Sequence, residues 1–220
     1  MAGLMAAAVR EGRRVVCVTA TRGEGGVQDE ERWPAAELAD IRTRELEKAL
    51  GILGVSEHLW LDYPDGGCPQ VDSEEPTARI EHIIRDVRPA AVMTFGPDGM
   101  TAHPDHQAVC DWTTDAFRRA AVPDSRLLYA AVTQEWFDEF KAGWESIGAF
   151  MGESVVPIVP REELAVHYEL PPDLLELKFE ALRVQESQSA GTIELLGEDF
   201  LMRDLAAEMF RFPTPSELER

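Results

Sequence analysis

Short apolar runs alternate with longer amphipathic stretches along the first half of this chain. The short runs are rich in Val, Ile, Leu and Phe, as in strands that are buried in a parallel sheet. The longer stretches carry apolar side chains at steps of three and four, which is the spacing of a helix with one buried face. The expected order is helix 2–11, strand 14–20, helix 35–53, strand 55–61, helix 77–87 and strand 90–95. This alternation predicts an α/β fold in which helices cover both faces of a mostly parallel sheet.

The second half of the chain continues the pattern with less regular spacing. Apolar runs predict strands over Leu127–Val132 and Ser154–Val159, and Pro157 favours an edge position for the second, because proline donates no ladder hydrogen bond. A short aromatic helix is expected over Trp136–Trp144 and a long helix over Pro172–Gln188, before a final helix and a packed tail. The sequence contains no repeat, low-complexity segment or linker, which predicts a single domain over residues 1–220.

Polar loops follow the first three expected strands. Glu24 lies in the loop after the first, Asp65 in the turn after the second, and His103 after the third. Parallel strands joined by right-handed crossovers end at one edge of the sheet, where α/β folds bind ligands, so we expect these loops to meet there. The glycines at Gly23–Gly26 give little support to a nucleotide site, because the loop lacks both the GxGxxG spacing and a Lys-Ser/Thr ending. A flexible crossover loop is the simpler interpretation.

The sequence His103-Pro104-Asp105-His106 carries the most specific chemistry. A helix is expected to begin here, since Pro104 suits the first helical position and Asp105 suits the positive end of the helix dipole. His103 and His106 lie three positions apart, close enough to serve one site as a metal ligand and an acid–base group. The alternative is a solvated helix cap whose polar side chains only satisfy backbone groups.

Arg42 and Glu45 also lie three positions apart, on the expected helix 35–53. On the surface of a helix this spacing predicts a solvated ion pair. Such a pair contributes little to stability.

The net charge, the cysteines and the apolar content limit the partners and the compartment that we expect for this protein. The net charge of -20 argues against nucleic acids and anionic membranes as partners, because phosphate contacts need clustered Lys and Arg. The three cysteines have no CxxC spacing, which predicts buried free thiols in a reducing, cytoplasmic compartment. No apolar run has the length of a transmembrane helix, and the positive charges near the N-terminus follow the apolar segment, which is the wrong order for a signal peptide.

Several segments together resemble the LmbE-like, or PIG-L, N-deacetylases. The similar segments are Thr19–Gly26, Leu38–Leu46 continuing into Leu53–Val55, Leu61–Gly66, Gly99–His106 and, at the family's C-terminal helix, Lys178–Gln188. Each segment alone is weakly specific, whereas their order and spacing are specific. The resemblance implies a Rossmann-like three-layer sandwich with a mostly parallel sheet. It also implies a zinc enzyme that removes acyl groups from N-acetylglucosamine conjugates and related amides.

The resemblance assigns roles to particular side chains. His106 matches the zinc-ligand histidine of the family. His103 matches the histidine that stabilises the tetrahedral intermediate or protonates the leaving amine, and Asp105 joins it as the second catalytic residue that we expect. The residues implied to contact the substrate or line its pocket are Arg42, Asp65 and Glu24.

The chain departs from the family pattern at its start. The family opens with a strand and the sequence Ala-His-Pro-Asp-Asp-Glu, which supplies two further zinc ligands and the general base. Here Met1–Met5 matches the helix that follows that motif, so the first strand is expected to be missing and the zinc ligand set to be incomplete. Three explanations stay open: a start codon assigned too far downstream, a truncated chain, and a degenerate copy. A missing strand predicts lower stability or association into homo-oligomers, because it exposes backbone donors.

Two classes of function therefore remain. The first is a zinc-dependent hydrolase that acts on the linear amide C–N bond of a small molecule, namely a sugar conjugate. The second is a catalytically incomplete, metal-free binding or scaffold protein on the same fold, because a fold does not determine a function.

Overall fold

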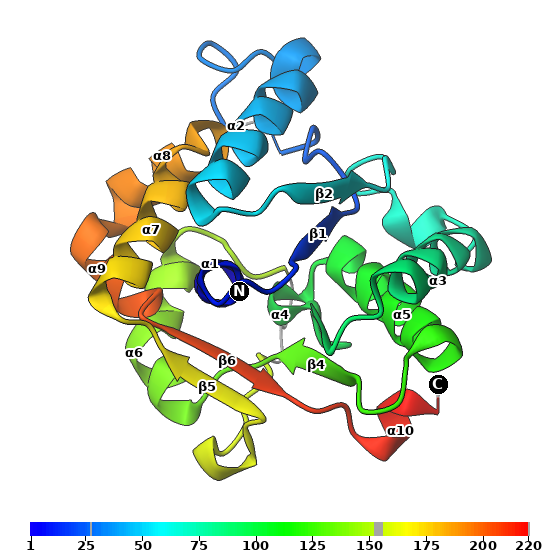
Figure 1. Ribbon diagram of the computed structural model, residues 1–220. Coiled ribbons are helices and arrows are strands. Elements are labelled where there is room, and N and C mark those ends of the chain that lie inside the picture. The colour runs from blue at the N-terminus through cyan, green and yellow to red at the C-terminus, as the bar shows by residue number, and fades with distance from the viewer. Residues whose placement is uncertain (27, 152–155, 220) are drawn as a thin grey trace. The chain divides into compact units, whose positions relative to one another are not determined.

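The computed structural model describes residues 1–26, 28–151 and 156–219 (Figure 1). The chain divides into two compact units. The first unit comprises Met1–Asp65 and Tyr168–Glu208, and the second comprises Gly66–His167 and Met209–Arg220. Both units combine helices with strands, so the predicted α/β class is confirmed. The single domain expected over residues 1–220 stays a prediction.

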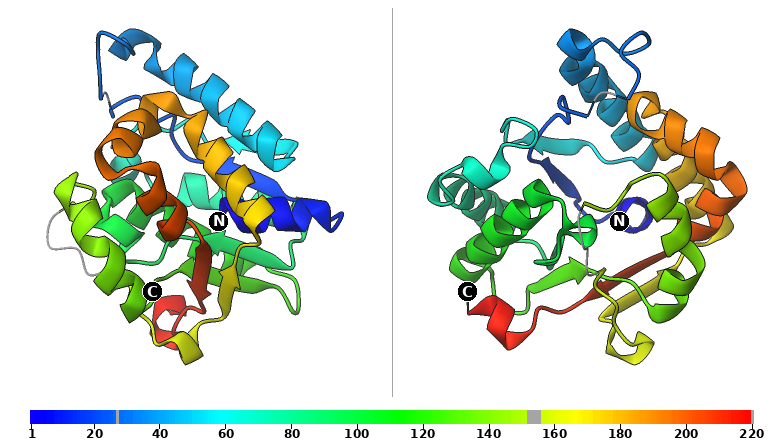
Figure 2. Two further views of the ribbon diagram at one scale, coloured as in Figure 1. Left: turned by 90° about the vertical axis from the view of Figure 1, so that its left-hand side faces the viewer. Right: turned by 180° about the vertical axis from the view of Figure 1, so that it is seen from behind.

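The first unit contains a parallel pair of strands and the helices of both chain segments. In β1 and β2, Val16 lies opposite Glu57 and Thr19 lies opposite Trp60. Figures 1 and 2 show α1, α2 and α7 side by side, and their apolar faces form a common core with Ala6, Leu50 and Leu174. The elements are α1 (Ala2–Arg10), β1 (Val16–Thr19), a 3₁₀ turn (Ala35–Glu37), α2 (Leu38–Leu53), β2 (Glu57–Trp60), α7 (Pro172–Arg183), α8 (Glu186–Leu196) and α9 (Glu198–Asp204).

The second unit is built around strands β3 and β4, which pair in parallel with Ala91 opposite Arg126. Strand β4 pairs antiparallel with β6, and the strand order is β3-β4-β6-β5. Helix α5 packs on α3, and its Cys110 joins Leu127 and Tyr129 of β4 in the core. The elements are a 3₁₀ turn (Cys68–Gln70), α3 (Glu74–Val87), β3 (Ala91–Thr94), α4 (Gly99–Ala102), α5 (Pro104–Ala120), β4 (Arg126–Ala130), α6 (Gln134–Ser146), a 3₁₀ turn (Arg161–Glu163) and α10 (Pro215–Leu218). Strands β5 (Val166–Glu169) and β6 (Ala207–Arg211) contain the positions where the chain passes from one unit to the other.

The expected long helix Pro172–Gln188 is wrong, because the chain forms two helices there. Helix α7 ends at Arg183, and α8 begins at Glu186. Between them, the Gln185 side-chain amide donates to the Ala181 carbonyl at 3.0 Å and so satisfies one of the last carbonyls of α7. The break turns the start of α8 inward, so that Ser187 is buried.

Other differences from the expected pattern concern strands. The packed tail contains β6, whose ladder partners lie far away in the sequence. The predicted strand Ser154–Val159 lies partly outside the described residues, and Ile158 makes only an isolated bridge to Val132. Strand β1 is not fully buried, because successive side chains point to opposite faces. Cys17 packs against the core, whereas Val18 and the opposite Leu59 are 37% and 42% exposed.

The three cysteines are free thiols, as predicted. Cys68 and Cys110 are buried as expected, whereas Cys17 is only partly buried. Burial raises the pKa of the Cys110 thiol to about 12, even though a hydrogen bond with Thr114 opposes the shift. Cys110 therefore stays protonated at neutral pH and is not a candidate nucleophile. In the described part of the chain, no helix has the length and apolar character needed to cross a membrane.

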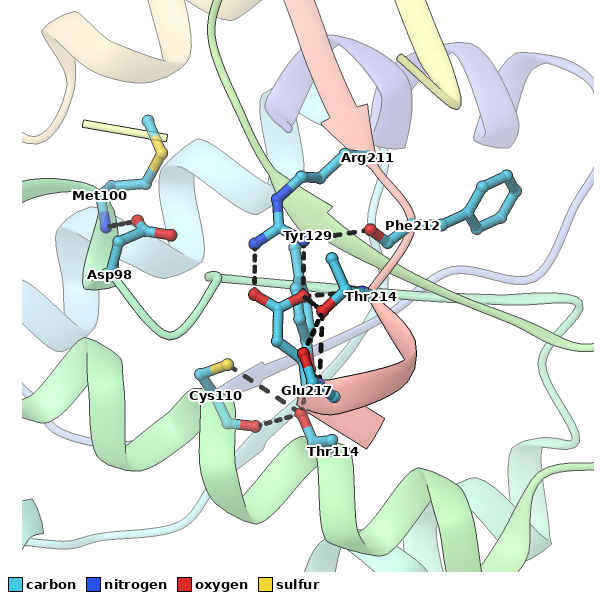
Figure 3. Close-up of polar contacts among 10 residues, drawn as sticks. Asp98, Met100, Cys110, Thr114, Tyr129, Arg211, Phe212, Thr214 and Glu217 are labelled. Carbon is cyan, nitrogen blue, oxygen red and sulfur yellow. Dashed lines mark hydrogen bonds and ion pairs between the residues drawn. The ribbon is translucent and has the colours of Figure 1, made fainter. Parts of the chain in front are cut away.

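Within the second unit, an ion pair connects α10 to β6. Figure 3 shows Arg211 of β6 beside Glu217 of α10, and the two hydrogen bonds between their side chains each measure 2.7 Å. Thr214 and Glu217 complete a capping box at the start of α10, and the Arg211 guanidinium lies 5.2 Å from the centre of the Tyr129 ring. Burial alone raises the pKa of Glu217, but hydrogen bonds from Arg211 and Thr214 outweigh it and lower the pKa from 4.5 to about 2.

Replacing Glu217 with glutamine is expected to lower the free energy of unfolding by about 1 kcal/mol at neutral pH, since water still reaches this pair. The folded-state pKa lies below the unfolded value, so this contribution is full above pH 4.5 and disappears as the pH falls through about 2. Urea unfolding of Glu217→Gln and wild type across that range checks the prediction. Glu219→Gln, at an exposed position, is the control. A difference that stays constant down to the lowest pH would contradict the assigned cause.

Candidate functional site

His103 is the N-cap of helix α5. Its ring Nδ1 accepts a hydrogen bond from the backbone N–H of Asp105 at 3.1 Å, and Pro104 takes the first helical position as predicted. A backbone N–H can only donate, so Nδ1 carries no proton and the neutral ring carries its proton on Nε2. The capping role and the expected chemical role are therefore compatible, because the cap fixes His103 as an Nε2–H donor.

His106 has the opposite tautomer. Its Nδ1 lies 3.0 Å from the Gly99 carbonyl oxygen, which can only accept, so this nitrogen carries the proton and Nε2 carries the lone pair. The His106 ring stacks on Phe95, with 3.9 Å between the centroids, and on His103 at 4.7 Å. A histidine with Nδ1–H bonded to a carbonyl is the usual arrangement of a metal ligand that binds through Nε2.

The Asp105 carboxylate, which is 5% exposed, holds the turn that follows β2. One oxygen accepts the N–H of Gly66 at 2.7 Å and the other accepts the N–H of Cys68 at 3.1 Å. Both oxygens thus bind backbone donors. The catalytic role expected for Asp105 stays a prediction, and this geometry favours a role in placing the turn.

The backbone before His103 is strained. Met100 and Ala102 have positive φ angles of 61° and 58°, which cost residues other than glycine about 1–3 kcal/mol each. The Asp98 carboxylate accepts the N–H of Met100 at 2.6 Å and so helps to hold this turn (Figure 3). The turn places the Gly99 carbonyl beside His106 Nδ1. The strained backbone therefore lies in the segment that orients the His106 ring.

In the first unit, Arg42 and Glu45 are not the solvated surface pair that the sequence predicts. Each is 7% exposed, and both side chains reach Ser187 at the start of α8. The Arg42 guanidinium also donates to the carbonyls of Gly23 and Gly26, the second at 2.7 Å. Burial lowers the pKa of Arg42, and the nearby carboxylates of Asp65, Glu45 and Glu24 oppose that shift.

Glu24 and Asp65, which come from two different loops, lie together as predicted, whereas the expected approach of the His103 loop stays a prediction. Glu24 Oε1 accepts the backbone N–H of Asp65 at 2.9 Å. The Asp65 carboxylate accepts the Thr21 hydroxyl and the Gly25 N–H, both at 3.1 Å. Glu24 Oε2 is buried and has no hydrogen-bond partner among the described residues. An unpaired buried carboxylate oxygen is costly, so it is the atom of this cluster best suited to accept a donor from a ligand.

Within residues 1–26, 28–151 and 156–219, no group of three or more His, Cys, Asp or Glu side chains is placed to hold a metal ion. A catalytic zinc site normally has three protein ligands. The tautomer of His106 suits one ligand, but the described residues do not form a complete zinc site. The incomplete ligand set expected from the sequence, with His106 as its member, stays a prediction.

Two features of the site have no clear signal in the sequence. Ser187 lies in a segment that resembles the family, but its buried contacts with Arg42 and Glu45 depend on the break between α7 and α8. The backbone donors of Gly66 and Cys68 that bind Asp105 gave no sequence signal, because a backbone N–H is present at every residue except proline.

Comparison with solved structures defines the class of fold. Diacetylchitobiose deacetylase from Pyrococcus horikoshii superposes with a TM-score of 0.66 over 100% of this chain and 80% of its own, at 23% sequence identity. At that identity the likeness shows the fold alone. The chain therefore has the α/β fold of this deacetylase.

Sequence comparison gives the family. Residues 1–117 match the family model "PIG-L: GlcNAc-PI de-N-acetylase". A 1D-myo-inositol 2-acetamido-2-deoxy-alpha-D-glucopyranoside deacetylase of Acidothermus cellulolyticus is 32% identical over 84% of this chain and 73% of its own length. The corresponding deacetylase of Kineococcus radiotolerans is 37% identical over 58% of this chain, and the match spans only 43% of that relative. The chain belongs to the PIG-L family, as the sequence resemblance predicts.

Proposed function

We propose that this protein removes the acetyl group from a small N-acetylglucosamine-type conjugate by hydrolysis. The observation that carries the proposal is the fixed tautomer of His103, which presents an Nε2–H donor at the start of α5. A preorganised donor of this kind stabilises the negative charge that develops on an amide oxygen during hydrolysis. Family membership and the names of the relatives support the choice of an acetamide on a sugar.

The reaction that we propose forms a C–O bond and breaks a C–N bond. Water adds to the carbonyl carbon of the acetamide and gives up one proton to the solvent, and the carbonyl oxygen takes the negative charge and accepts a hydrogen bond from His103 Nε2–H. The C–N bond then breaks, the amine nitrogen takes one proton back from the solvent, and acetic acid, which ionises to acetate, and the free amine are released. No step of this proposal runs through a metal, because the described residues do not form a complete ligand set.

Within the first unit, the Glu24 and Asp65 cluster is proposed to accept a hydroxyl group of a ligand. Glu24 Oε2 is buried without a partner in the described chain and can accept a sugar hydroxyl. Asp65 is held by Thr21 and Gly25, so its carboxylate is fixed before a ligand arrives. A buried acceptor without its donor disfavours ligands that lack the matching hydroxyl, which provides specificity.

A second candidate is a binding protein without turnover. The observation that favours it is the lack of a three-ligand metal group within the described residues. This candidate retains the sugar-binding cluster around Glu24 but has no hydrolysis step.

An assay for the free amine separates the two candidates. The protein is incubated with the N-acetylglucosamine–inositol conjugate named for its relatives, with and without added Zn²⁺, and binding is measured in parallel by calorimetry. Hydrolysis predicts an amine signal that grows with time and enzyme concentration. Saturable binding without amine in either condition would reject the enzyme and support the binding protein.

A further inference from the structure

We propose that Ser187 is a positioning residue that acts through Arg42 to hold the loop Gly23–Gly26, and that Glu45 fixes Ser187 in place. The hydrogen bonds and burial described in the first unit carry this inference. Its consequence for sugar binding rests on the proposed function, because Glu24 lies in the loop.

Ser187 donates two hydrogen bonds to Glu45. One Glu45 oxygen accepts the Ser187 backbone N–H at 2.9 Å, and the other accepts its hydroxyl at 2.6 Å. Ser187 is 1% exposed, so these bonds form away from water, where a charge-assisted hydrogen bond is strong. The carboxylate also satisfies a free N–H at the start of α8, as an N-terminal cap does. Ser187 is therefore fixed in both rotamer and backbone position.

Arg42 connects Ser187 to the loop. Its Nε lies 3.4 Å from the Ser187 hydroxyl oxygen, and its two terminal nitrogens donate to the carbonyls of Gly23 and Gly26. The guanidinium is a rigid planar fork, so holding Nε also sets the direction of the other two nitrogens. All three nitrogens point to protein acceptors, which favours a positioning role for Arg42 over the direct substrate contact that the family resemblance implies.

The glycines of the loop fit this arrangement. A Cβ added to Gly23 would overlap Arg42 Nη1, and one added to Gly26 would lie 3.1 Å from the same atom. Gly23 also has a φ of 72°, which favours glycine. The glycines thus let two carbonyls approach a guanidinium, which explains a glycine-rich loop that lacks a phosphate-binding pattern.

Two further contacts join the loop region to the start of α8. Gln28 donates to the Gln188 carbonyl at 3.1 Å, and Arg32 pairs with Glu186 at 2.7 Å. Both contacts are exposed and contribute little to stability. Among these contacts, the buried one at Ser187 is therefore the main connection between the loop region and the start of α8. Without the Ser187 hydroxyl, Arg42 loses its fixed direction, and the Glu24 carboxylate is no longer held beside Asp65.

The test compares two serines of the same helix. Ser187→Ala removes the hydroxyl that joins Glu45 and Arg42. Ser189→Ala, at a position that is 3% exposed, removes a hydroxyl that donates to the Gln185 carbonyl at 3.0 Å within its own helix region. Hydrogen exchange of residues 21–26 is expected to be about tenfold faster in Ser187→Ala and unchanged in Ser189→Ala. With the N-acetylglucosamine–inositol conjugate, KM is expected to rise about tenfold in Ser187→Ala at unchanged kcat.

Equal exchange of the loop in the two variants, or a fall in kcat at constant KM, would overturn the proposal. If Ser187→Ala does not fold, Glu45→Gln gives the same readouts, because it replaces the acceptor of the Ser187 hydroxyl and keeps the acceptor for its N–H. A wild-type protein without deacetylase activity would reject the proposed function alone. The exchange comparison would still decide the role of Ser187.

Discussion

Replacing His103 with alanine is expected to lower kcat by about two to four orders of magnitude, with little change in KM. The reason is that the Nε2–H of His103 is proposed to bind the amide oxygen mainly when it becomes negatively charged, and removing such a donor affects the transition state more than the bound substrate. The measurement is the rate of amine release from the N-acetylglucosamine–inositol conjugate. Unchanged turnover would reject the role assigned to His103.

Two further variants separate catalysis from folding. Alanine also removes the N-cap of α5, which is expected to cost about 1 kcal/mol of stability. His103→Asn restores a capping side chain but places no Nε2–H in the site, so it is expected to recover the stability and not the turnover. His82→Ala, at an exposed position of α3, is the control for a surface histidine and should leave both unchanged.

Replacing Glu208 with alanine is expected to lower the free energy of unfolding by about 3–5 kcal/mol, since it leaves a buried charge without its partner. Glu208 is 4% exposed and lies 2.9 Å from the ammonium of Lys178, which is 8% exposed. Its oxygens also accept the N–H groups of Gly3 and Leu4 at 2.9 and 2.8 Å, so the variant exposes the start of α1 as well. Urea unfolding at neutral pH checks this value.

The pH dependence of the difference in unfolding free energy between Glu208→Ala and wild type tests whether the charge of Glu208 causes that difference. Burial alone raises the pKa of Glu208, but the amino group of Met1 and Lys178 outweigh it and lower the pKa from 4.5 to about 2. The stabilisation is therefore full above pH 4.5 and is lost as the pH falls through about 2. Glu198→Ala, which breaks the exposed pair with Arg183, is the control and should cost about 1 kcal/mol or less. If Glu208→Ala and Glu198→Ala lose the same free energy of unfolding, burial of the Glu208 ion pair is not the reason for its large contribution.

Local signals predicted the helices and loops that frame the candidate sites. Gly54, with a φ of 75°, ends α2 as its position in the sequence suggests, and Pro104 opens α5. Glu24 and Asp65 follow successive strands, and the parallel pairing of β1 with β2 brings their loops together. Patterns of this kind are visible in the sequence because each depends on residues close along the chain.

Features that depend on distant partners could not be predicted in the same way. The burial of Arg42 and Glu45 requires Ser187, which lies more than a hundred residues later. Their spacing on a helix is the same for an exposed ion pair and for a buried contact with another segment. Strand β6 forms against β4 in the same manner, through a partner that its own sequence does not indicate.

Hydrolysis of an acetamide is tested most directly by following both products in water enriched with heavy oxygen. The account predicts that acetate and the free amine appear in equal amounts, and that each acetate carries one oxygen from the solvent. Binding of the conjugate without release of acetate, or an acetate that carries no solvent oxygen, would contradict it.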